Sequence, residues 1–222
     1  MINLSKRLRA IHDLVDKGSI VADIGSDHAL LACALIESET SPYVYASDIA
    51  AGPLSHAQST ILAYAMDLNI ETIRSDGLHE LVNQVDTIVI AGMGSDTIIH
   101  ILEQDYDKVL QAKSIIIQSN THVFDIRRWI SDHHLQIVDE VMVKESHYYQ
   151  IIKVDVKEGN SLTEDEILFG KIIKDKNIFI DYWNFRLNNL NSIINRLKPD
   201  HASYQKNLIL KERIINKINS LT

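Results

Sequence analysis

LQIVDEVMVKESHYYQIIKVDV, at residues 135–156, contains two runs of strand-forming residues that follow each other closely. The runs cover residues 135–143 and 148–156, and only KESH lies between them. A crossover between parallel strands needs about a dozen residues, whereas a hairpin needs only a short turn. We therefore predict an antiparallel hairpin at one edge of a sheet.

Five shorter apolar runs precede this hairpin and alternate with segments of helical periodicity. The predicted strands are residues 20–24, 43–47, 70–73, 87–91 and 114–118, and the predicted helices lie near 28–37, 53–66, 95–104 and 123–134. This alternation is typical of βαβ units, and the continuous β-branched runs indicate strands covered on both faces. Dinucleotide-binding Rossmann sheets are wholly parallel. The predicted fold class is therefore α/β, with the Rossmann-like class I methyltransferase sheet that ends in an antiparallel hairpin.

The strand pattern stops at KEGNS, residues 157–161. Beyond it, Thr163 and Glu166 have the spacing of a capping box at the start of a helix. Leucine and isoleucine then recur at helical spacing, with a break at Pro199 and Asp200. We predict two domains: residues 1–158 form the sheet domain, and residues 159–222 form an α-helical, coiled-coil-like antiparallel pair.

Composition excludes several classes of protein. The 222 residues are 45% hydrophobic and 23% charged, as in ordinary globular chains and unlike disordered ones. The single cysteine, Cys33, excludes a disulfide framework and a multi-cysteine zinc site and favours a reducing compartment. No apolar run has the length of a signal-peptide core or a membrane span, so we expect a cytoplasmic protein without membrane association.

Charge is distributed unevenly along the chain. The formal net charge is −8, and residues 161–222 carry 10 basic and 7 acidic residues, which leaves 12 − 23 = −11 for residues 1–160. An acidic body is not typical of a protein coated for nucleic acid, but a local basic stripe can still follow phosphates. Net charge alone therefore does not decide whether RNA is a partner.

The loop after the first predicted strand carries ADIGSDHA at residues 22–29. A pyrophosphate-binding loop needs several glycines, and the second and third are absent here. The carboxylate of Asp27 repels a pyrophosphate and favours a cationic ligand, such as the sulfonium and ammonium groups of S-adenosylmethionine. The competing interpretation is an ordinary turn in which Asp27 is the N-cap of the next helix.

Further candidates follow the next three strands. Asp48 ends the second strand, where an acidic side chain can accept both ribose hydroxyls of a nucleoside. Asp76, beside Gly77, follows the third and can accept a hydrogen bond from an adenine amino group. After the fourth strand, Gly92 permits close approach of a ligand and Met93 offers an apolar surface to adenine. Each position is also compatible with an ordinary loop, but carboxylates at the carboxyl ends of successive strands favour a nucleoside site.

Four short motifs stand in a specific order: LSKRL at residues 4–8, ADIGSDHA at 22–29, IAGMG at 90–94 and QSNTH at 118–122. Together they resemble the bacterial tRNA adenine(22)-N1-methyltransferase family, over the whole chain. The resemblance implies methyl transfer from S-adenosylmethionine to N1 of an adenine in tRNA, without a metal. It also implies a Rossmann-like domain followed by a coiled-coil domain. We further expect a monomer that has no protein partner.

On this resemblance, the predicted catalytic residues are Asp27, His28 and Asn120. N1 of adenine has an in-plane lone pair and needs no base before attack, so Asp27 would stabilise the cationic product or accept its amino proton, with His28 as proton carrier. Asn120 would hydrogen-bond the target base. The predicted cofactor-binding residues are Asp23, Gly25, Ser26, Asp48, Ile49, Asp76, Gly77, Gly92 and Met93.

Basic side chains near the mouth of the predicted crevice are candidates for contacts with RNA phosphates. They are Lys6, Arg7, Arg9, Arg127 and Arg128. A phosphate grip is needed because N1 lies on the Watson–Crick edge, so a paired adenine must leave its partner before reaction. The alternative interpretation is that these are solvated surface charges. Two other functions also fit the sequence: a non-catalytic RNA-binding protein that keeps a nucleoside pocket, and a methyltransferase of another RNA base.

Overall fold

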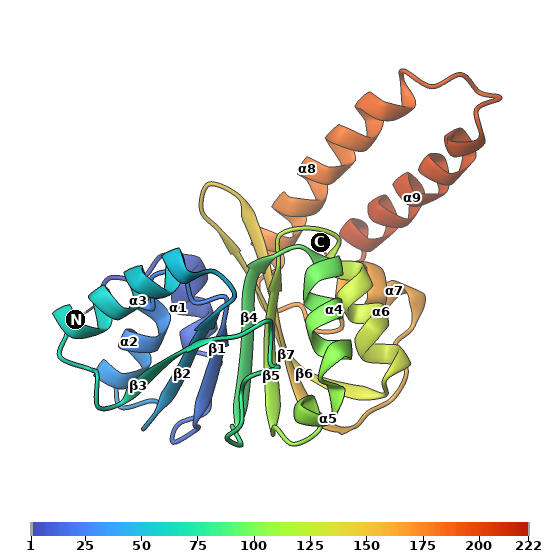
Figure 1. Ribbon diagram of the computed structural model, residues 1–222. Coiled ribbons are helices and arrows are strands. Elements are labelled where there is room, and N and C mark those ends of the chain that lie inside the picture. The colour runs from blue at the N-terminus through green and yellow to red at the C-terminus, as the bar shows by residue number, and fades with distance from the viewer. Residues whose placement is uncertain (1, 222) are drawn as a thin grey trace. The chain divides into compact units, whose positions relative to one another are not determined.

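The computed structural model describes residues 2–221 and contains a seven-stranded sheet (Figure 1). Its strand order is β3-β2-β1-β4-β5-β7-β6. The first five strands of this order are parallel, and β7 runs antiparallel to β5 and β6. The strands are β1 (Val21–Ile24), β2 (Val44–Asp48), β3 (Ile70–Arg74), β4 (Thr87–Met93), β5 (Ser114–Ser119), β6 (Leu135–Lys144) and β7 (Tyr148–Glu158).

The predicted hairpin is confirmed as the antiparallel edge of the sheet. Lys144 at the end of β6 stands opposite Tyr148 at the start of β7. The hairpin returns so that β7 lies between β5 and β6, with Ile117 of β5 opposite Ile152 of β7. This arrangement confirms the predicted sheet, in which parallel strands end in an antiparallel pair.

Alternation along the strands divides the apolar side chains between two cores, one on each face of the sheet. Ile88 and Ile90 of β4 belong to one core, and Val89 between them belongs to the other. In the same way, Ile115 and Ile117 of β5 point to the first face, and Ile116 points to the second. Successive side chains of a strand point to opposite faces, so a continuous run of isoleucine and valine is required where helices cover both sides.

Helices cover the two faces in groups that follow chain order (Figure 1). On the face of Val89 lie α1 (Lys6–His12), α2 (Leu30–Glu37) and α3 (Ala51–Ala63). On the face of Ile88 lie α4 (Ser95–Gln104), α5 (Tyr106–Val109) and α6 (Val123–Asp132). The predicted helices correspond to α2, α3, α4 and α6, and both α1 and α5 are additional.

The short helix α1 was not predicted because seven residues are too few to display a helical period. Its start is fixed by Ser5, whose hydroxyl accepts a hydrogen bond from the backbone N–H of Leu8 at 3.2 Å. The carboxylate of Glu145, in the turn of the β6–β7 hairpin, accepts the backbone N–H of Lys6 at 2.6 Å. The hairpin turn therefore holds the helix in place.

The boundary between the two compact units lies later than the predicted one after residue 158. Residues 1–172 form the first unit and residues 173–222 the second. The helix α7 (Glu164–Phe169), predicted with the tail, belongs to the first unit. Its capping box of Thr163 and Glu166 is present as predicted. The carbonyl of Ile167 accepts a hydrogen bond from Arg127 of α6, and this contact ties α7 to the sheet domain.

The second unit is a pair of helices, α8 (Lys176–Ile194) and α9 (Ala202–Asn219). The two lie side by side and run in opposite directions (Figure 1). Asp175 caps the first by accepting the backbone N–H groups of Asn177 and Ile178. No helix of residues 2–221 combines the length and the apolar character needed to cross a bilayer.

Candidate active site

A crevice of about 160 Å³ opens at the carboxyl ends of β1 and β4. Its wall includes most of the loop after β1, the beginning of α2, Ala91 of β4 and Arg7 of α1. Ligands of open α/β sheets bind outside the carboxyl ends of the strands, where the strand order reverses. Here the order reverses between β1 and β4, so the crevice lies at that switch point.

The loop after β1 turns sharply at Gly25, whose φ is +79°. The carbonyl of Ser47 in β2 accepts the backbone N–H groups of both Gly25 and Ser26, at 2.8 and 2.9 Å. A methyl group on Gly25 would overlap Met93 Cε, so the turn needs glycine for its dihedral angle and for its space. The predicted cofactor residues Gly25 and Met93 are therefore in contact although they are far apart in sequence.

Asp27 does not cap the helix that follows. The N-cap of α2 is Ala29, in the left-handed region with φ of 51°, and no side chain caps that helix. The Asp27 carboxylate instead lies 3.3 Å from Nε2 of His28, and both side chains are more than half exposed. The N-cap interpretation is wrong, and the carboxylate stays accessible at the rim of the crevice.

Asp23 is the buried charge of the crevice. Its side chain belongs to β1 and is 7% exposed. Burial raises the pKa of Asp23 to about 6, and the Ser26 hydroxyl and the Arg7 guanidinium oppose that rise. A buried carboxylate in a water-accessible crevice favours a cation beside it, because the cation offsets the free-energy cost of keeping the carboxylate ionised away from water.

Arg7 turns into the crevice and begins a chain of hydrogen bonds that crosses the sheet. Its Nη1 donates to Oε1 of Gln118 at 2.7 Å, and Nε2 of Gln118 donates to Oδ1 of Asn120 at 3.1 Å. Nδ2 of Asn120 then donates to the carbonyl of Gly92 at 2.6 Å. Gln118 is fully buried, so its amide depends on these protein groups for its hydrogen bonds. The predicted residues Asn120 and Gly92 are thus joined, and Asn120 has a fixed orientation.

Gln118 is a site residue that the sequence interpretation missed. The available signal was an amide at the end of the buried run Ile115, Ile116, Ile117, because a buried polar side chain requires partners. Arg7 was assigned to a surface cluster, and its guanidinium instead lines the crevice and lies 5.6 Å from the centre of the Tyr149 ring.

The remaining cofactor candidates lie along the neighbouring strand ends and do not line the crevice. Asp48 ends β2, and its Oδ1 accepts the backbone N–H of Ala50 at 2.9 Å. Ile49 follows with its side chain 60% exposed. Asp76 is exposed in the turn after β3, where Gly77 has φ of +61°. Because β2 lies beside β1 and β3 lies beside β2, these residues extend the same edge of the sheet away from the crevice.

The basic candidates divide by burial. The prediction that Arg127 contacts RNA is wrong. The residue is 2% exposed, and its Nε donates to Oε1 of Glu140 at 2.7 Å inside the domain. It cannot reach an RNA phosphate. Arg128 is exposed and forms a two-pronged ion pair with Glu164, both hydrogen bonds being 3.1 Å. Lys6 is exposed and Arg9 is half-buried, both on α1.

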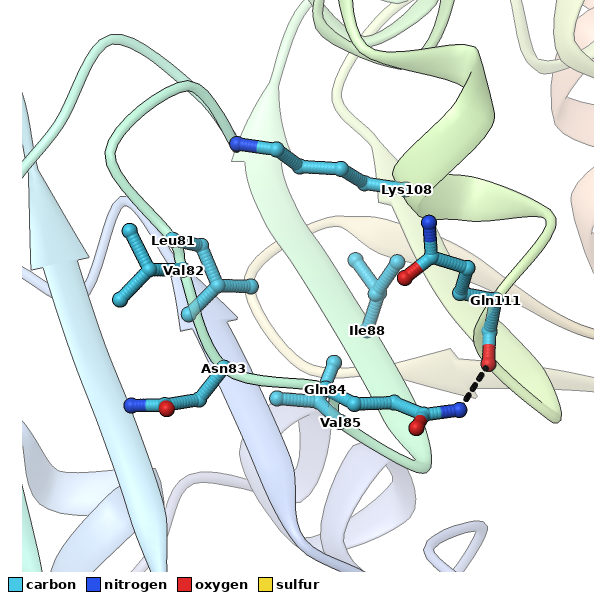
Figure 2. Close-up of a pocket in the computed structure, with 8 residues that line it drawn as sticks. All are labelled: Leu81, Val82, Asn83, Gln84, Val85, Ile88, Lys108 and Gln111. Carbon is cyan, nitrogen blue, oxygen red and sulfur yellow. Dashed lines mark hydrogen bonds between the residues drawn. The ribbon is translucent and has the colours of Figure 1, made fainter.

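A second, larger cavity of about 310 Å³ contains none of the predicted site residues (Figure 2). It lies between the loop of residues 81–85 and the segment around α5, near the start of β4. Its polar contacts stay within the protein, since Nε2 of Gln84 donates to the carbonyl of Gln111 and Nζ of Lys108 donates to the carbonyl of Leu78. The start of a parallel strand is not the ligand-binding end of such a sheet.

Comparisons with known proteins point to one family. A family model described as tRNA (adenine(22)-N(1))-methyltransferase matches residues 21–220. The tRNA (adenine(22)-N(1))-methyltransferase of Bacillus subtilis is 30% identical over 220 residues, which cover 95% of this chain and 92% of the relative. The structure of M. capricolum TrmK with S-adenosyl-homocysteine has a TM-score of 0.90 and 31% identity, with 99% of each chain covered. Sp1610 of Streptococcus pneumoniae in complex with S-adenosyl-L-methionine has a TM-score of 0.89 and 28% identity, over 97% of this chain and all of that one.

Proposed function

The chain belongs to the tRNA (adenine(22)-N(1))-methyltransferase family and is an S-adenosylmethionine-dependent tRNA methyltransferase, and we propose how its own residues perform that reaction. The observation that carries the proposal is the crevice at β1, whose lining includes both the buried Asp23 and Arg7, which interact electrostatically. An anionic and a cationic side chain in one crevice suit a ligand that carries both a positive and a negative charge.

The amino-acid half of S-adenosylmethionine has that pattern, an ammonium and a sulfonium together with a carboxylate. Asp23 would accept a charge-assisted hydrogen bond from the ammonium and attract the sulfonium by charge alone, and Arg7 would donate a charge-assisted hydrogen bond to the carboxylate. Gly25 would let the backbone approach the ligand closely. Asp48, at the end of β2, would accept ribose hydroxyls. When bound, the cofactor supplies an activated methyl group, and the protein supplies position and charge.

Asp27 and His28 would act on the adenine. Both are exposed at the crevice rim, so a base that has left its helix can reach them. The N1 lone pair needs no base, but methylation leaves a positive charge on the ring. The Asp27 carboxylate would stabilise that charge, and His28 at 3.3 Å would accept and release the amino proton.

Asn120 would orient the base. Its Nδ2 is engaged by Gly92 and its Oδ1 is held by Gln118, so one lone pair of Oδ1 remains for the adenine amino group. An acceptor at this position binds the amino group without occupying the N1 lone pair that must react. The fixed amide therefore favours the reactive orientation.

Methyl transfer to tRNA is tested by incubating the protein with tritiated S-adenosylmethionine and a tRNA transcript, followed by nucleoside analysis. We expect N1-methyladenosine, and we expect none from a matched transcript with guanosine at position 22. Label in another nucleoside would support the alternative of a different RNA base. Absence of label together with retained tRNA binding would support a non-catalytic RNA-binding protein.

Replacing Asp27 with asparagine is expected to lower kcat about 100-fold, because the charge that stabilises the product is lost while the shape is kept. Cofactor affinity should change by less than about threefold, since the Asp27 side chain is 61% exposed to water at the rim of the crevice. Calorimetry and single-turnover assays measure the two quantities. Asp48→Asn is the matched control, with weaker cofactor binding and an unchanged rate at saturation. Equal losses in both quantities for Asp27→Asn would make Asp27 a cofactor ligand.

Recognition of the tRNA body would use exposed cations. Lys6 remains exposed near the crevice, and Arg128 is exposed on α6. The second unit adds Lys198, Lys206 and Lys211, in keeping with its net positive charge. We propose that the protein acts as a monomer in the cytoplasm, where tRNA is matured, and sedimentation with and without tRNA tests the stoichiometry.

A further inference from the structure

Two histidines and an aspartate converge at the crevice rim. Asp27 and His28 come from the loop after β1, and His56 comes from α3. One oxygen or nitrogen of each residue lies within 4.8 Å of those of the other two. The His28 and His56 rings are stacked, with centroids 5.4 Å apart and planes 14° from parallel. His56 has no part in the chemistry proposed for methyl transfer.

The donor set suits a divalent transition metal. Imidazole nitrogen and carboxylate oxygen are the ligands of Zn²⁺ sites with three protein ligands, in which water completes the tetrahedron. Metal–nitrogen bonds of about 2.0–2.1 Å place two ligand atoms about 3.3 Å apart in a tetrahedron. The Asp27 to His28 distance is already 3.3 Å. The ligand atom of His56 lies within 4.8 Å of the other two, and its exposed side chain has room to move toward them.

The electrostatic surroundings favour a cation. Residues 1–160 carry a net charge of 12 − 23 = −11, and Asp27 is itself a ligand of the cluster. Within residues 2–221, no lysine or arginine forms an ion pair with Asp27. Among those residues, the only charged or titratable partner of its carboxylate is His28. A dication therefore gains the carboxylate without breaking an existing salt bridge.

We propose that Asp27, His28 and His56 form a binding site for a divalent transition-metal ion of the Zn²⁺ type. Methyl transfer does not use this ion. The ion occupies the two side chains that would serve the adenine, so its binding inhibits the enzyme. The inhibition rests on the function proposed for Asp27 and His28, whereas the binding site itself does not.

The site is tested by calorimetric titration of the tag-free chain with Zn²⁺ as chloride. We expect one ion per chain, and affinity at least tenfold lower for His56→Ala. His79→Ala is the matched control, because His79 is as exposed as His28 and lies 3.7 Å from one carboxylate, Asp105, but is not in a three-ligand cluster. Its affinity should stay within twofold of the parent chain. Equal affinities for His56→Ala and the parent, or no binding at all, would overturn the proposal.

Methyl-transfer assays with added Zn²⁺ test whether Zn²⁺ binding at this site inhibits the enzyme. Zn²⁺ should inhibit the parent chain and inhibit His56→Ala at least tenfold less, with chelation restoring activity. His56→Ala without metal should retain the parent rate, because the proposed methyl transfer assigns no step to His56 and its contact with His28 is an exposed ring stack. If calorimetry shows the site and Zn²⁺ leaves the rate unchanged, the metal site stands and the role proposed for Asp27 and His28 is wrong.

Discussion

Asp23→Asn is expected to weaken S-adenosylmethionine binding about 100-fold at pH 7.5, which corresponds to about 2.7 kcal/mol. The amide keeps the shape of the carboxyl group and removes the charge that the cationic ligand pairs with. Burial strengthens that pairing because little water screens it. Calorimetric titration of both chains with the cofactor measures the ratio.

The pH dependence of cofactor binding should show whether Asp23 is the carboxylate that pairs with the cofactor cation. Burial raises the pKa of Asp23 to about 6, and a cation binds only the ionised form. Cofactor affinity of the parent chain should therefore fall about tenfold per pH unit on acidification below 6, and it should be flat in Asp23→Asn. A parent profile without this acid limb would show that Asp23 does not carry the cofactor charge.

Stability should change in the opposite direction to binding. The folded pKa of Asp23 lies above its ordinary value of 3.8, so the folded state holds the proton more tightly than the unfolded state. The free energy of unfolding therefore decreases as pH rises from about 4 to 6, and the ionised form costs up to about 3 kcal/mol. Asp23→Asn removes this cost, so above pH 6 it should be at least as stable as the parent while binding cofactor poorly.

Asp86→Asn is the matched control for that comparison. The ammonium of Lys113 at 2.8 Å and the backbone N–H of Ile20 lower the pKa of Asp86. Its stabilising contribution is present above the unfolded pKa and is lost as pH falls through the lower folded value. At neutral pH, Asp86→Asn should destabilise the fold and leave cofactor binding unchanged. The ionised Asp86 carboxylate thus raises the free energy of unfolding, whereas the ionised Asp23 carboxylate lowers it.

The fold could be predicted because its signals are local. The four-residue gap at 144–147 leaves room only for a hairpin. The continuous apolar runs follow from burial of both sheet faces, since Ile88 and Ile90 point to one core and Val89 to the other. The difference between the predicted domain boundary and the division of the structure into compact units has a physical cause. The strand pattern ends near residue 158, but α7 is held by Arg127 of α6, and the residues just after α7 are held by Glu140 of β6.

The candidate site could be predicted only in part. Asp23 lies near the end of β1, and Gly25 and Asp27 lie in the loop that follows it, so their proximity followed from the sequence. The contact of Arg7 with Gln118 joins residues 111 positions apart, and no local pattern encodes it. Periodicity indicates which face of a helix is buried, but not which distant partner a charged side chain finds.

Arg127 and Arg128 illustrate the same limit, since adjacent arginines have opposite environments. The Arg127 and Glu140 side chains are 3% and 5% exposed, and those of Arg128 and Glu164 are 49% and 68% exposed. Glu140 also accepts the backbone N–H groups of Lys171 and Ile172, at 2.5 and 2.8 Å. The buried pair therefore organises the chain after α7, whereas the exposed pair lies in solvent.

Arg127→Met is expected to lower the free energy of unfolding by about 3–5 kcal/mol, because it leaves the Glu140 carboxylate buried without its cation. Arg128→Met should cost less than about 1 kcal/mol, since water already solvates both of its charges. Urea denaturation followed by circular dichroism compares the two variants with the parent. Adding Glu140→Gln to Arg127→Met should recover part of the loss, because a neutral amide oxygen can still accept the two backbone N–H groups. A loss for Arg127→Met no larger than that for Arg128→Met would mean that water reaches Glu140, and the charge would then not be buried.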